Sequence, residues 1–337
     1  MAYCKINKEN YFYNLSKVEQ KIGIDKIAVV LKNNAYGHGI DEISKLANEY
    51  GIKHSITISV NEAVKISHLF ESVLVLQDIP KDQVSDNIII TINSIETISK
   101  LSPKTKVELE IDTGMNRNGI SINQINEALN QIVEYDLKLN GVFTHFSSAY
   151  IDDNSIDIQE NKFDYIRSKI IDDNRFSEKV RFHCSASSAL YRFDNNVYDL
   201  VRVGIISYGY LSLPSNHKLP KLKPVLSLWA EKVTSRMIDK SESVGYGRMY
   251  TANKKMEIST YDIGYGDGFM RLDGSKNIFL KNGRRILGIT SMNSFTAEGN
   301  DDEVCVFDDI TELANTHGTI VYELLSRINP NLNRKVI

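Results

Sequence analysis

The 337-residue sequence is poor in cysteine, and this scarcity excludes two kinds of structure. Its three cysteines, Cys4, Cys184 and Cys305, lie far apart and form no C-x-x-C pair. Because a disulfide framework or a structural zinc site needs paired or clustered cysteines, neither is expected. The low and odd number of thiols instead favours a reducing cytoplasm as the compartment of the protein.

Long apolar runs and charge of one sign are also missing. No segment approaches the roughly 18–20 apolar residues of a membrane span. Residues 1–15 lack the charged and apolar regions of a secretory signal, so export is not expected. The 40 basic and 43 acidic side chains leave a formal net charge of −3, which favours neither nucleic acid nor a membrane as a partner.

The sequence does contain an alternation of short β-branched runs and helix-like segments. Eight runs predict strands, at 26–31, 54–60, 73–79, 87–92, 107–111, 139–146, 180–184 and 200–206. Helical spacing of apolar residues predicts helices at 41–50, 61–71, 93–101 and 122–135, with Asn61 and Asn93 as N-caps. This alternation suits a (β/α)8 TIM barrel or a doubly wound open sheet, and eight strands within about 200 residues favour the closed barrel.

The pattern changes after residue 220. Glycine turns join predicted strands at 223–238, 255–268, 277–293 and 301–308, "KNGRR" at 281–285 is typical of a hairpin, and a helical pair is expected at 310–318 and 320–328. A linker rich in Pro and Ser at 211–221 precedes this region. We therefore expect an α/β fold with a barrel domain at 1–220 and a smaller, mostly β domain at 221–337. The first few residues are candidates for pairing with the β domain.

Chemically active side chains stand at the carboxyl ends of the predicted barrel strands, where such barrels form their active sites. Lys32 ends the first strand, Arg117 lies in a loop after the fifth, and His145 ends the sixth. Ser187 follows the seventh strand, and Arg202 lies in the eighth. Singly, each has an ordinary structural explanation, such as a surface ion pair, a core histidine or a helix cap. Together they suit pyridoxal phosphate, which a lysine binds as a Schiff base while a hydroxyl and backbone N–H groups bind the phosphate.

Seven sequence blocks carry a family resemblance. In chain order they are "AVVLKNNAYGHG", "DTGMNRNG", "FTHFSSA", "VRVGI", "VGYGRMYTA", "IGYGDGFMR" and "SMN". The same order occurs in alanine racemases, so the sequence resembles these fold-type III pyridoxal-phosphate enzymes over nearly its whole length. The resemblance implies an N-terminal barrel, a C-terminal β domain and a head-to-tail homodimer with shared active sites. It also implies interconversion of L- and D-alanine, which supplies D-alanine for peptidoglycan.

The resemblance assigns cofactor-binding roles by position. Lys32 matches the lysine that holds pyridoxal phosphate and acts as the first base. Arg202 matches the arginine that faces the pyridine nitrogen, and His145 matches the histidine that packs near the ring and orients the catalytic tyrosine. The positions of the phosphate-binding group are matched by Tyr36, Ser187, Gly204, Ile205 and Tyr265.

The second base and the substrate group are assigned in the same way. Tyr246 matches the second base, which the neighbouring subunit supplies. Arg117 and Met292 match the groups that hold the substrate carboxylate, with Met292 also from the neighbouring subunit. Glu110 stands where many members have a carbamylated lysine, and its carboxylate is expected to position Arg117 without modification. Two bases on opposite faces suit racemisation, because one proton leaves Cα and another returns from the other side.

Five positions depart from the family pattern. Ala186 replaces an asparagine, Val203 a proline, Ile289 an arginine and Asn293 an aspartate, while Pro330 stands near a gate tyrosine of many members. Because these changes bear on the substrate gate, a racemase of serine or a larger amino acid is the alternative. A non-catalytic pyridoxal-phosphate-binding protein is another, although such a carrier needs no second base. A fold-related decarboxylase or aldolase lacks support from any cysteine motif or metal pair.

Overall fold

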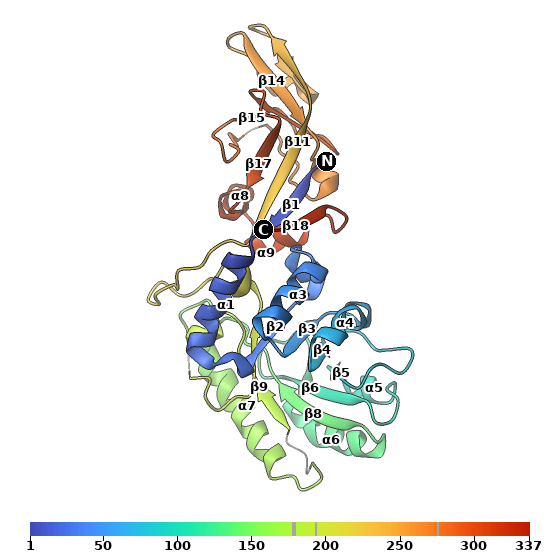
Figure 1. Ribbon diagram of the computed structural model, residues 1–337. Helices are drawn as coiled ribbons and strands as arrows, with labels where there is room; N and C mark the ends of the chain where they lie inside the picture. Colours follow the sequence, from blue (N-terminus) through green and yellow to red (C-terminus); the bar gives the residue numbers. More distant parts are fainter. Residues whose placement is uncertain (177–179, 193, 275) are drawn as a thin grey trace. The chain divides into compact units, whose positions relative to one another are not determined.

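The computed structural model describes residues 1–176, 180–192, 194–274 and 276–337 (Figure 1). The chain forms two compact units. The barrel unit comprises Phe12–Asn33 and Ile43–Lys223, and the β unit comprises Met1–Tyr11, Asn34–Glu42 and Pro224–Ile337. Both units are therefore assembled from separate stretches of the sequence. Among the described residues, no helix has the length and apolar character needed to span a membrane.

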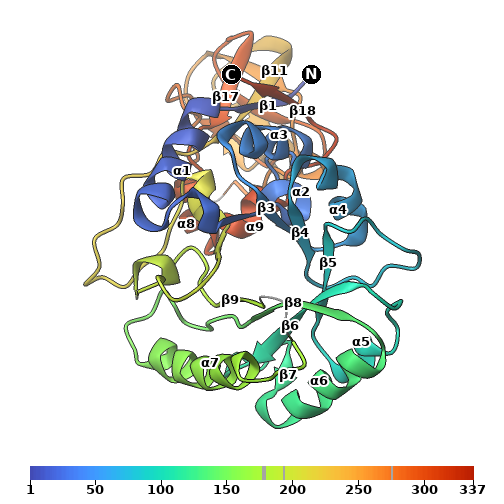
Figure 2. The same cartoon turned by 60° about the horizontal axis from the view of Figure 1, so that its bottom comes forward.

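The barrel unit is built on eight parallel strands in the order β10-β2-β3-β4-β5-β6-β8-β9 (Figure 2). A parallel bridge between Ala186 and Arg202 joins the two ends of this order, and the Arg202 N–H donates to the Ser185 carbonyl oxygen at 3.0 Å. The predicted barrel is confirmed, because each of the eight predicted runs overlaps one of these strands. The strands are β2 Ile27–Val30, β3 His54–Thr57, β4 Ser72–Val75, β5 Ile88–Ile92, β6 Lys106–Asp112, β8 Lys138–Phe143, β9 Arg181–His183 and β10 Val201–Val203. The short β7 Ile120–Ser121 pairs with β6.

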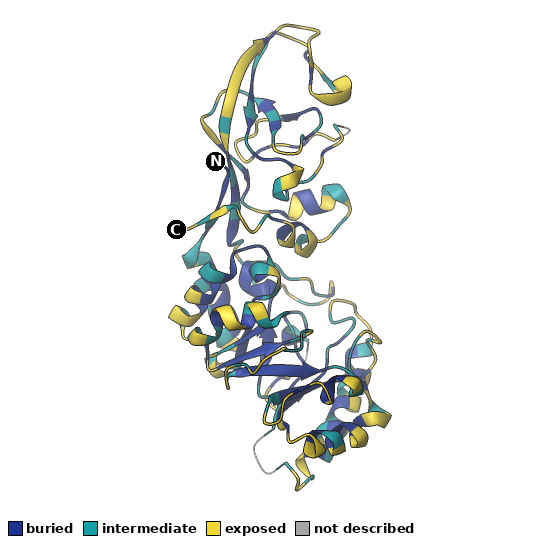
Figure 3. Cartoon of the chain, turned by 90° about the vertical axis from the view of Figure 1, so that its right-hand side faces the viewer, coloured by how far each residue is buried: buried dark blue, intermediate teal, exposed yellow. Residues whose placement is uncertain are grey.

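Burial on both faces explains why the strand runs are continuous in β-branched residues. Every residue of β2, "IAVV", and of β5, "IIITI", is buried. Figure 3 shows the barrel strands as buried and the exposed residues gathered on the surrounding helices. Such sequences favour extended backbone and fill the space between the strands and their helices, which makes the barrel a packed core.

The four predicted helices occur with altered bounds, and both predicted N-caps are wrong. Ser59 caps the helix predicted to begin at Asn61, because its Oγ accepts the Glu62 N–H at 3.2 Å. Ser94, rather than Asn93, occupies the N-cap position of the next helix. In both cases a serine adjacent to the first turn takes the capping position. The helices are α3 Ile40–Tyr50, α4 Val60–Ile66, α5 Ile95–Ile98 and α6 Ile125–Glu134.

Two long helices were not predicted: α1 Lys8–Ile22 and α7 Ser155–Ile171. The Asn14 side chain of α1 fixes the far end of the linker. Its amide donates to the Lys223 carbonyl oxygen at 2.7 Å, and its carbonyl oxygen accepts the Lys223 N–H at 2.9 Å. Residues 209–225 contain neither helix nor strand, so this contact orders an otherwise irregular connection.

The segment after the first barrel strand forms a left-handed helical turn. In α2, Lys32–Tyr36, residues 33–36 have φ values of 52–53°. Asparagine tolerates this region, but each ordinary L-residue placed there costs roughly 1–2 kcal/mol. Ala35 and Tyr36 therefore carry backbone strain, which the Asn34 Oδ1 helps to offset by accepting the Ile40 N–H at 2.8 Å. Strain of this kind concentrates at functional sites.

The β unit has a sheet in the order β15-β16-β14-β11-β1-β18, with β17 paired to β11. The strand near the N-terminus, β1, pairs antiparallel with β11 and parallel with β18. The predicted "KNGRR" hairpin is present, since the Leu280 N–H donates to the Arg284 carbonyl oxygen at 2.8 Å and Gly283 has a φ of 80°. The strands are β1 Tyr3–Ile6, β11 Leu226–Ile238, β12 Ser243–Val244, β13 Tyr250–Thr251, β14 Met256–Tyr261, β15 Ile286–Leu287, β16 Phe295–Glu298, β17 Glu303–Phe307 and β18 Asn333–Val336, and the helices are α8 Thr311–His317 and α9 Val321–Ser326.

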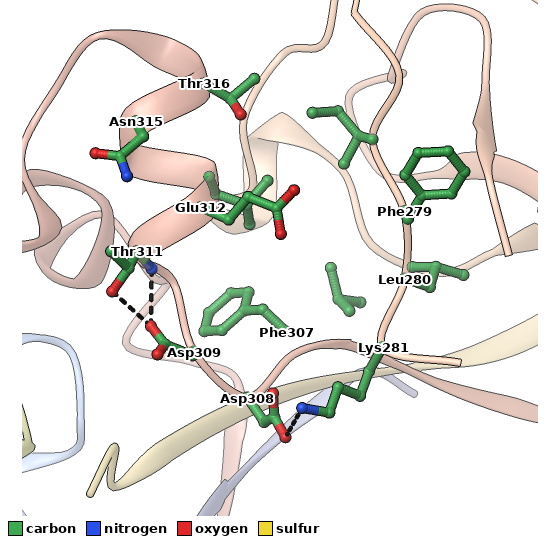
Figure 4. A pocket seen from close by; sticks show the side chains of 13 residues that line it. Phe279, Leu280, Lys281, Phe307, Asp308, Asp309, Thr311, Glu312, Asn315 and Thr316 are labelled. Carbon is green, nitrogen blue, oxygen red and sulfur yellow. Dashed lines mark hydrogen bonds and ion pairs between the residues drawn. The ribbon is translucent and has the colours of Figure 1, made fainter. Parts of the chain in front are cut away.

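A cavity of about 500 Å³ lies in the β unit beside α8 (Figure 4). Lys281 Nζ and Asp308 Oδ2 form an ion pair at 2.9 Å on its wall. Asp309 stabilises the start of α8, because its Oδ1 accepts the Thr311 N–H at 2.9 Å. None of the predicted site residues lines this cavity, so it is distinct from the candidate site.

Candidate active site

Lys32 stands at the end of the first barrel strand among other cationic side chains of the barrel unit. Burial lowers the pKa of its amine, and the charges of Arg117 and Arg202 lower it further. An amine with a lowered pKa carries an unprotonated lone pair more often at neutral pH. Lys32 therefore has the electronic character that a nucleophilic or basic lysine needs.

Arg202 is buried in β10 and held by five acceptors. Its Nη2 donates to the Thr144 and Cys184 carbonyl oxygens at 2.7 and 2.9 Å and to His145 Nδ1 at 3.1 Å. Its Nη1 donates to His183 Nδ1 at 2.8 Å and to the His183 carbonyl oxygen at 3.3 Å. Burial lowers the pKa of Arg202 to about 10, so it remains charged at neutral pH. All five of these contacts are made by Nη1 and Nη2, and none by Nε.

The contacts of Arg202 fix the protonation of both neighbouring histidines. Since a guanidinium only donates, His145 and His183 each accept through an unprotonated Nδ1. A neutral imidazole then carries its proton on Nε2. Burial, followed by the charge of Arg202, lowers the pKa of His145 to about 3, which keeps this ring neutral. His145 thus offers an Nε2–H donor beside a fixed cation.

Ser187 and the segment after β10 form a second polar group. Ser187 Oγ accepts the Gly204 N–H at 3.2 Å and the Ile206 N–H at 3.5 Å. Ile205 begins a 3-10 turn, Ile205–Tyr208, directly after Gly204. Because Oγ is an acceptor in both contacts, the Ser187 hydroxyl proton remains able to donate to an anion. The structure thus brings three of the predicted phosphate-binding residues together.

Glu110 and Arg117 are near each other without an ion pair. Glu110 is buried in β6, and burial raises the pKa of its carboxyl above the usual value although the charges of Arg202 and Arg117 oppose this rise. Among the described residues, no oxygen of Glu110 lies within ion-pair distance of Arg117. The loop that carries Arg117 is held by Asp112, whose Oδ1 accepts the backbone N–H groups of residues 114–116 at 2.9–3.1 Å. The structure therefore places Glu110 close enough to Arg117 for their charges to interact, without an ion pair among the described residues.

The remaining predicted residues belong to the β unit. Tyr246 begins a 3-10 turn, Tyr246–Arg248, and its side chain is 69% exposed. Met292 is 57% exposed and adjoins the Tyr265 loop, because the Met292 carbonyl oxygen accepts the Gly266 N–H at 2.7 Å. In a single chain both side chains are thus open to solvent.

Tyr36 ends the left-handed turn and contacts a residue that was not predicted. Its ring lies 5.9 Å from that of Tyr322 in α9, at an interplanar angle of 53°. Burial raises the pKa of Tyr36, and the neighbouring phenol of Tyr322 raises it further. Tyr36 is therefore a neutral hydrogen-bond donor at physiological pH, which suits a phosphate ligand.

Comparison with known families identifies the chain. Residues 6–212 match the family described as "Alanine racemase, N-terminal domain", and residues 225–336 match "Alanine racemase, C-terminal domain". The chain belongs to the alanine racemase family. Members of this family are pyridoxal-phosphate-dependent isomerases. An alanine racemase of Campylobacter concisus is 39% identical over 342 residues, covering 100% of both chains. One of Nitratiruptor is 40% identical and covers 99% of both chains.

Solved structures support the same family. The alanine racemase of Bacillus anthracis, solved with bound L-Ala-P, has a TM-score of 0.87 at 26% identity and covers 100% of this chain and 95% of its own. A histidine racemase of Leuconostoc mesenteroides has a TM-score of 0.82 at 22% identity and covers 100% of this chain and 98% of its own. The second likeness concerns the fold alone. The same fold therefore occurs in racemases named for different amino acids.

Three residues of the site were missed by the sequence reasoning. Glu108, Arg181 and His183 lie behind Arg202 in the alanine racemase barrel and connect to it by hydrogen bonds. A signal for them was present. Glu108 and Glu110 alternate in β6, as do Arg181 and His183 in β9, so each pair lies on one face of its strand. Charged residues at alternating positions of a doubly buried strand indicate a polar group inside the barrel.

Proposed function

We propose that the protein interconverts L- and D-alanine with pyridoxal phosphate bound in the barrel, and so supplies D-alanine for peptidoglycan. The observation that carries the proposal is the meeting of Lys32, His145 and Arg202 at one rim, in a chain that resembles alanine racemases over its full length. The three free cysteines fit a cytoplasmic location.

The residues present fit the cofactor. Lys32 would hold its aldehyde carbon covalently, Arg202 would direct its Nε–H at the pyridine nitrogen, and His145 would pack near the ring. The phosphate would be held by Tyr36, Ser187, Gly204, Ile205 and Tyr265. When bound, pyridoxal phosphate supplies an electron sink that makes the Cα proton of an amino acid acidic. A permanently charged arginine facing the ring disfavours a proton on its nitrogen, which restrains the sink and limits transamination.

The proton transfers fall to two side chains. Lys32 Nζ would remove or return the Cα proton on one face, and the Tyr246 hydroxyl would do so on the other. His145 would orient Tyr246. Arg117 and Met292 would hold the substrate carboxylate, which fixes the face of Cα that each base meets. Lys32 is suited to its role by its lowered pKa.

A homodimer would complete the site. Tyr246 and Met292 are exposed on the β unit of a single chain, which suits residues that act in the site of a second copy. In such a two-fold dimer each active site takes Lys32 from one chain and Tyr246 from the other. The proposed partner is therefore another copy of this chain, with a small amino acid as the substrate.

Spectroscopy and chiral analysis of the purified protein test the proposal. After loading with pyridoxal phosphate, we expect an absorbance band near the visible edge that borohydride removes, and conversion of L-alanine to the D form. L-Serine and L-lysine are assayed in parallel, since faster conversion of either would make that amino acid the substrate. A bound cofactor without any racemisation would indicate a carrier, and failure to bind the cofactor would overturn the proposal.

Replacing Glu110 with glutamine should weaken substrate binding more than turnover. If the Glu110 charge positions Arg117 for a carboxylate bound in both ground and transition states, its loss raises KM by about ten-fold while kcat changes by about two-fold or less. Steady-state kinetics in both directions measure this split. Glu127→Gln, a change on the exposed face of α6, is the control. A fall in kcat with KM unchanged would contradict this role of Glu110.

Replacing Arg202 with glutamate should redirect the reaction. A carboxylate beside the pyridine nitrogen stabilises a proton there, so we expect racemisation to slow by about 100-fold and pyruvate, the product of transamination, to accumulate. The variant should also melt at a lower temperature, because three backbone carbonyls lose their donor. Pyruvate is measured enzymatically, using variant protein that circular dichroism shows to be folded. Unchanged pyruvate formation would count against Arg202 facing the ring.

A further inference from the structure

A chain of hydrogen bonds crosses the barrel interior behind Arg202. His183, which accepts from Arg202 through Nδ1, meets Glu108 Oε2 through Nε2 at 2.8 Å. Glu108 Oε1 accepts from Arg181 Nε, and Arg181 Nη1 donates to Ser72 Oγ at 3.0 Å. Neither Glu108 nor His183 has any exposed surface. We call Arg181, Glu108, His183 and Arg202 the relay.

Glu108 is the one anion of the relay. Burial alone would raise the pKa of its carboxyl, but the charge of Arg181 and the hydrogen bond from His183 hold this pKa at about 2. Burial lowers the pKa of His183 to about 4 although Glu108 opposes the change. At neutral pH, therefore, an ionised carboxylate accepts a hydrogen bond from a neutral imidazole.

The barrel makes room for this anion. Strand β8 runs between β6, which carries Glu108, and β9, which carries Arg181. The side chains of Glu108 and Arg181 meet over Gly141 of β8, where an added Cβ would be 2.8 Å from both Glu108 Cδ and Arg181 Cγ. The ring of His183 stacks on Phe143 of the same strand, with centroids 4.9 Å apart and planes at 9°. Both the carboxylate and the ring are thus fixed in place by packing.

Because Glu108 and His183 are fixed in place, the Glu108 carboxylate influences how His183 binds Arg202. Because Glu108 accepts from Nε2, the His183 proton stays there and the Nδ1 lone pair faces Arg202. The negative charge also makes that lone pair a stronger acceptor, as a carboxylate does for a histidine that binds a metal or a hydroxyl. With its Nη atoms held in this way, Arg202 has only its Nε–H left to direct at a ligand.

We propose that Glu108 is a positioning residue that acts through His183 to set the direction and the donor strength of Arg202. The inference rests on the proposed function, in which Arg202 faces the pyridine nitrogen. Glu108 itself touches neither substrate nor cofactor. If the hydrogen bond between Glu108 and His183 is weakened, Arg202 would be held less firmly and the ring nitrogen could take a proton. Some turnovers would then end in transamination, in which the amino group of alanine passes to the cofactor and pyruvate is released.

The first test uses the protein before cofactor is added. Nitrogen NMR of protein labelled at histidine reports which ring nitrogen carries the proton, and the His183 signals are assigned by their loss in His183→Gln. We expect His183 to be neutral and protonated at Nε2 between pH 6 and 8. A proton on Nδ1, or a doubly protonated ring, would overturn the inference. This outcome does not depend on cofactor binding or on activity.

The second test separates positioning from simple charge neutralisation. Glu108→Gln leaves Arg181 unpaired, so the variant should lose thermal stability, and we expect about ten-fold more pyruvate per racemisation turnover. The double variant Glu108→Gln with Arg181→Met removes both charges and should recover stability. If Glu108 acts on Arg202, the pyruvate ratio and the altered absorbance of the bound cofactor persist in the double variant. If both return to those of the unmodified protein, Glu108 serves only to neutralise Arg181, and the inference fails.

Ser72→Ala is the matched control at the far end of the relay. It removes the hydroxyl that contacts Arg181 and His54 but leaves Glu108, His183 and Arg202 intact. The His183 signals and the pyruvate ratio should both stay as in the unmodified protein. A protein that binds no pyridoxal phosphate, yet shows the expected His183 tautomer, would refute the proposed function and leave the relay standing.

Discussion

We expect that replacing Lys32 with alanine lowers racemisation in both directions by about 1,000-fold or more and prevents covalent attachment of the cofactor. In the proposed function this one side chain has two roles, as the attachment point of the cofactor and as one of the two bases. Its lowered pKa, caused by burial and two nearby arginines, equips Lys32 for both tasks. Absorbance after loading with pyridoxal phosphate, and chiral analysis of alanine from either enantiomer, measure the two losses separately.

A second lysine at the other end of the same strand provides the control. Lys26 precedes β2 and donates to the Asn195 and Asn196 carbonyl oxygens at 3.2 and 2.8 Å. Lys26→Ala should keep the absorbance band and the activity. Borohydride reduction followed by peptide mapping locates the attachment directly. Label on any lysine other than Lys32 would refute the assignment.

Mixing the Tyr246→Phe and Lys32→Ala variants under conditions that allow subunit exchange should restore activity, although we expect each variant to be nearly inactive alone. Loss of a general acid–base group costs about 10²–10⁴-fold, so neither homodimer has appreciable activity. If each site draws Lys32 and Tyr246 from different chains, as proposed, one site of a mixed dimer carries both lesions and the other carries neither. Recovery up to half of the normal activity per mixed dimer is expected. No recovery would mean that Tyr246 acts within its own chain.

Proton exchange with deuterated solvent tests the direction of each base. By family resemblance, the lysine handles the proton of the D-enantiomer and the tyrosine that of the L-enantiomer. Tyr246→Phe should therefore still exchange the Cα proton of D-alanine while failing to racemise it. Tyr165→Phe, at a surface tyrosine of α7 that is 62% exposed, should change neither reaction. Equal loss of exchange from both enantiomers would contradict the two-base assignment.

The barrel strands were predictable because their burial on both faces leaves a continuous apolar signal. The runs at β2 and β5 contain only apolar residues and one threonine, and each proved wholly buried. Helix ends were less predictable, since Ser59 and Asn61 are both good caps and only the backbone path selects between them. The left-handed turn at 33–36 was not predictable from Ala35 and Tyr36, which disfavour that conformation, although two asparagines and Gly37 hint at it.

Site residues at strand ends were predictable for a different reason. Parallel strands in a barrel bring their carboxyl ends to one rim, so Lys32, His145 and Arg202 could be placed near one another from sequence position alone. The hydrogen bonds around these residues could not be predicted in the same way. The contact between the side chains of Glu108 and Arg181, for example, spans the intervening strand β8. It exists because Gly141 leaves space there, and only the three-dimensional register of the barrel reveals that coincidence.

The position of β1 between β11 and β18 in the sheet of the β unit has a consequence for folding during synthesis. Its neighbours, β11 and β18, begin at Leu226 and Asn333, and so leave the ribosome long after β1 itself. At roughly 5–20 residues per second, β1 waits on the order of tens of seconds for its last partner. During that time β1 lacks first both and then one of its hydrogen-bonding neighbours, a state in which strands pair with other chains.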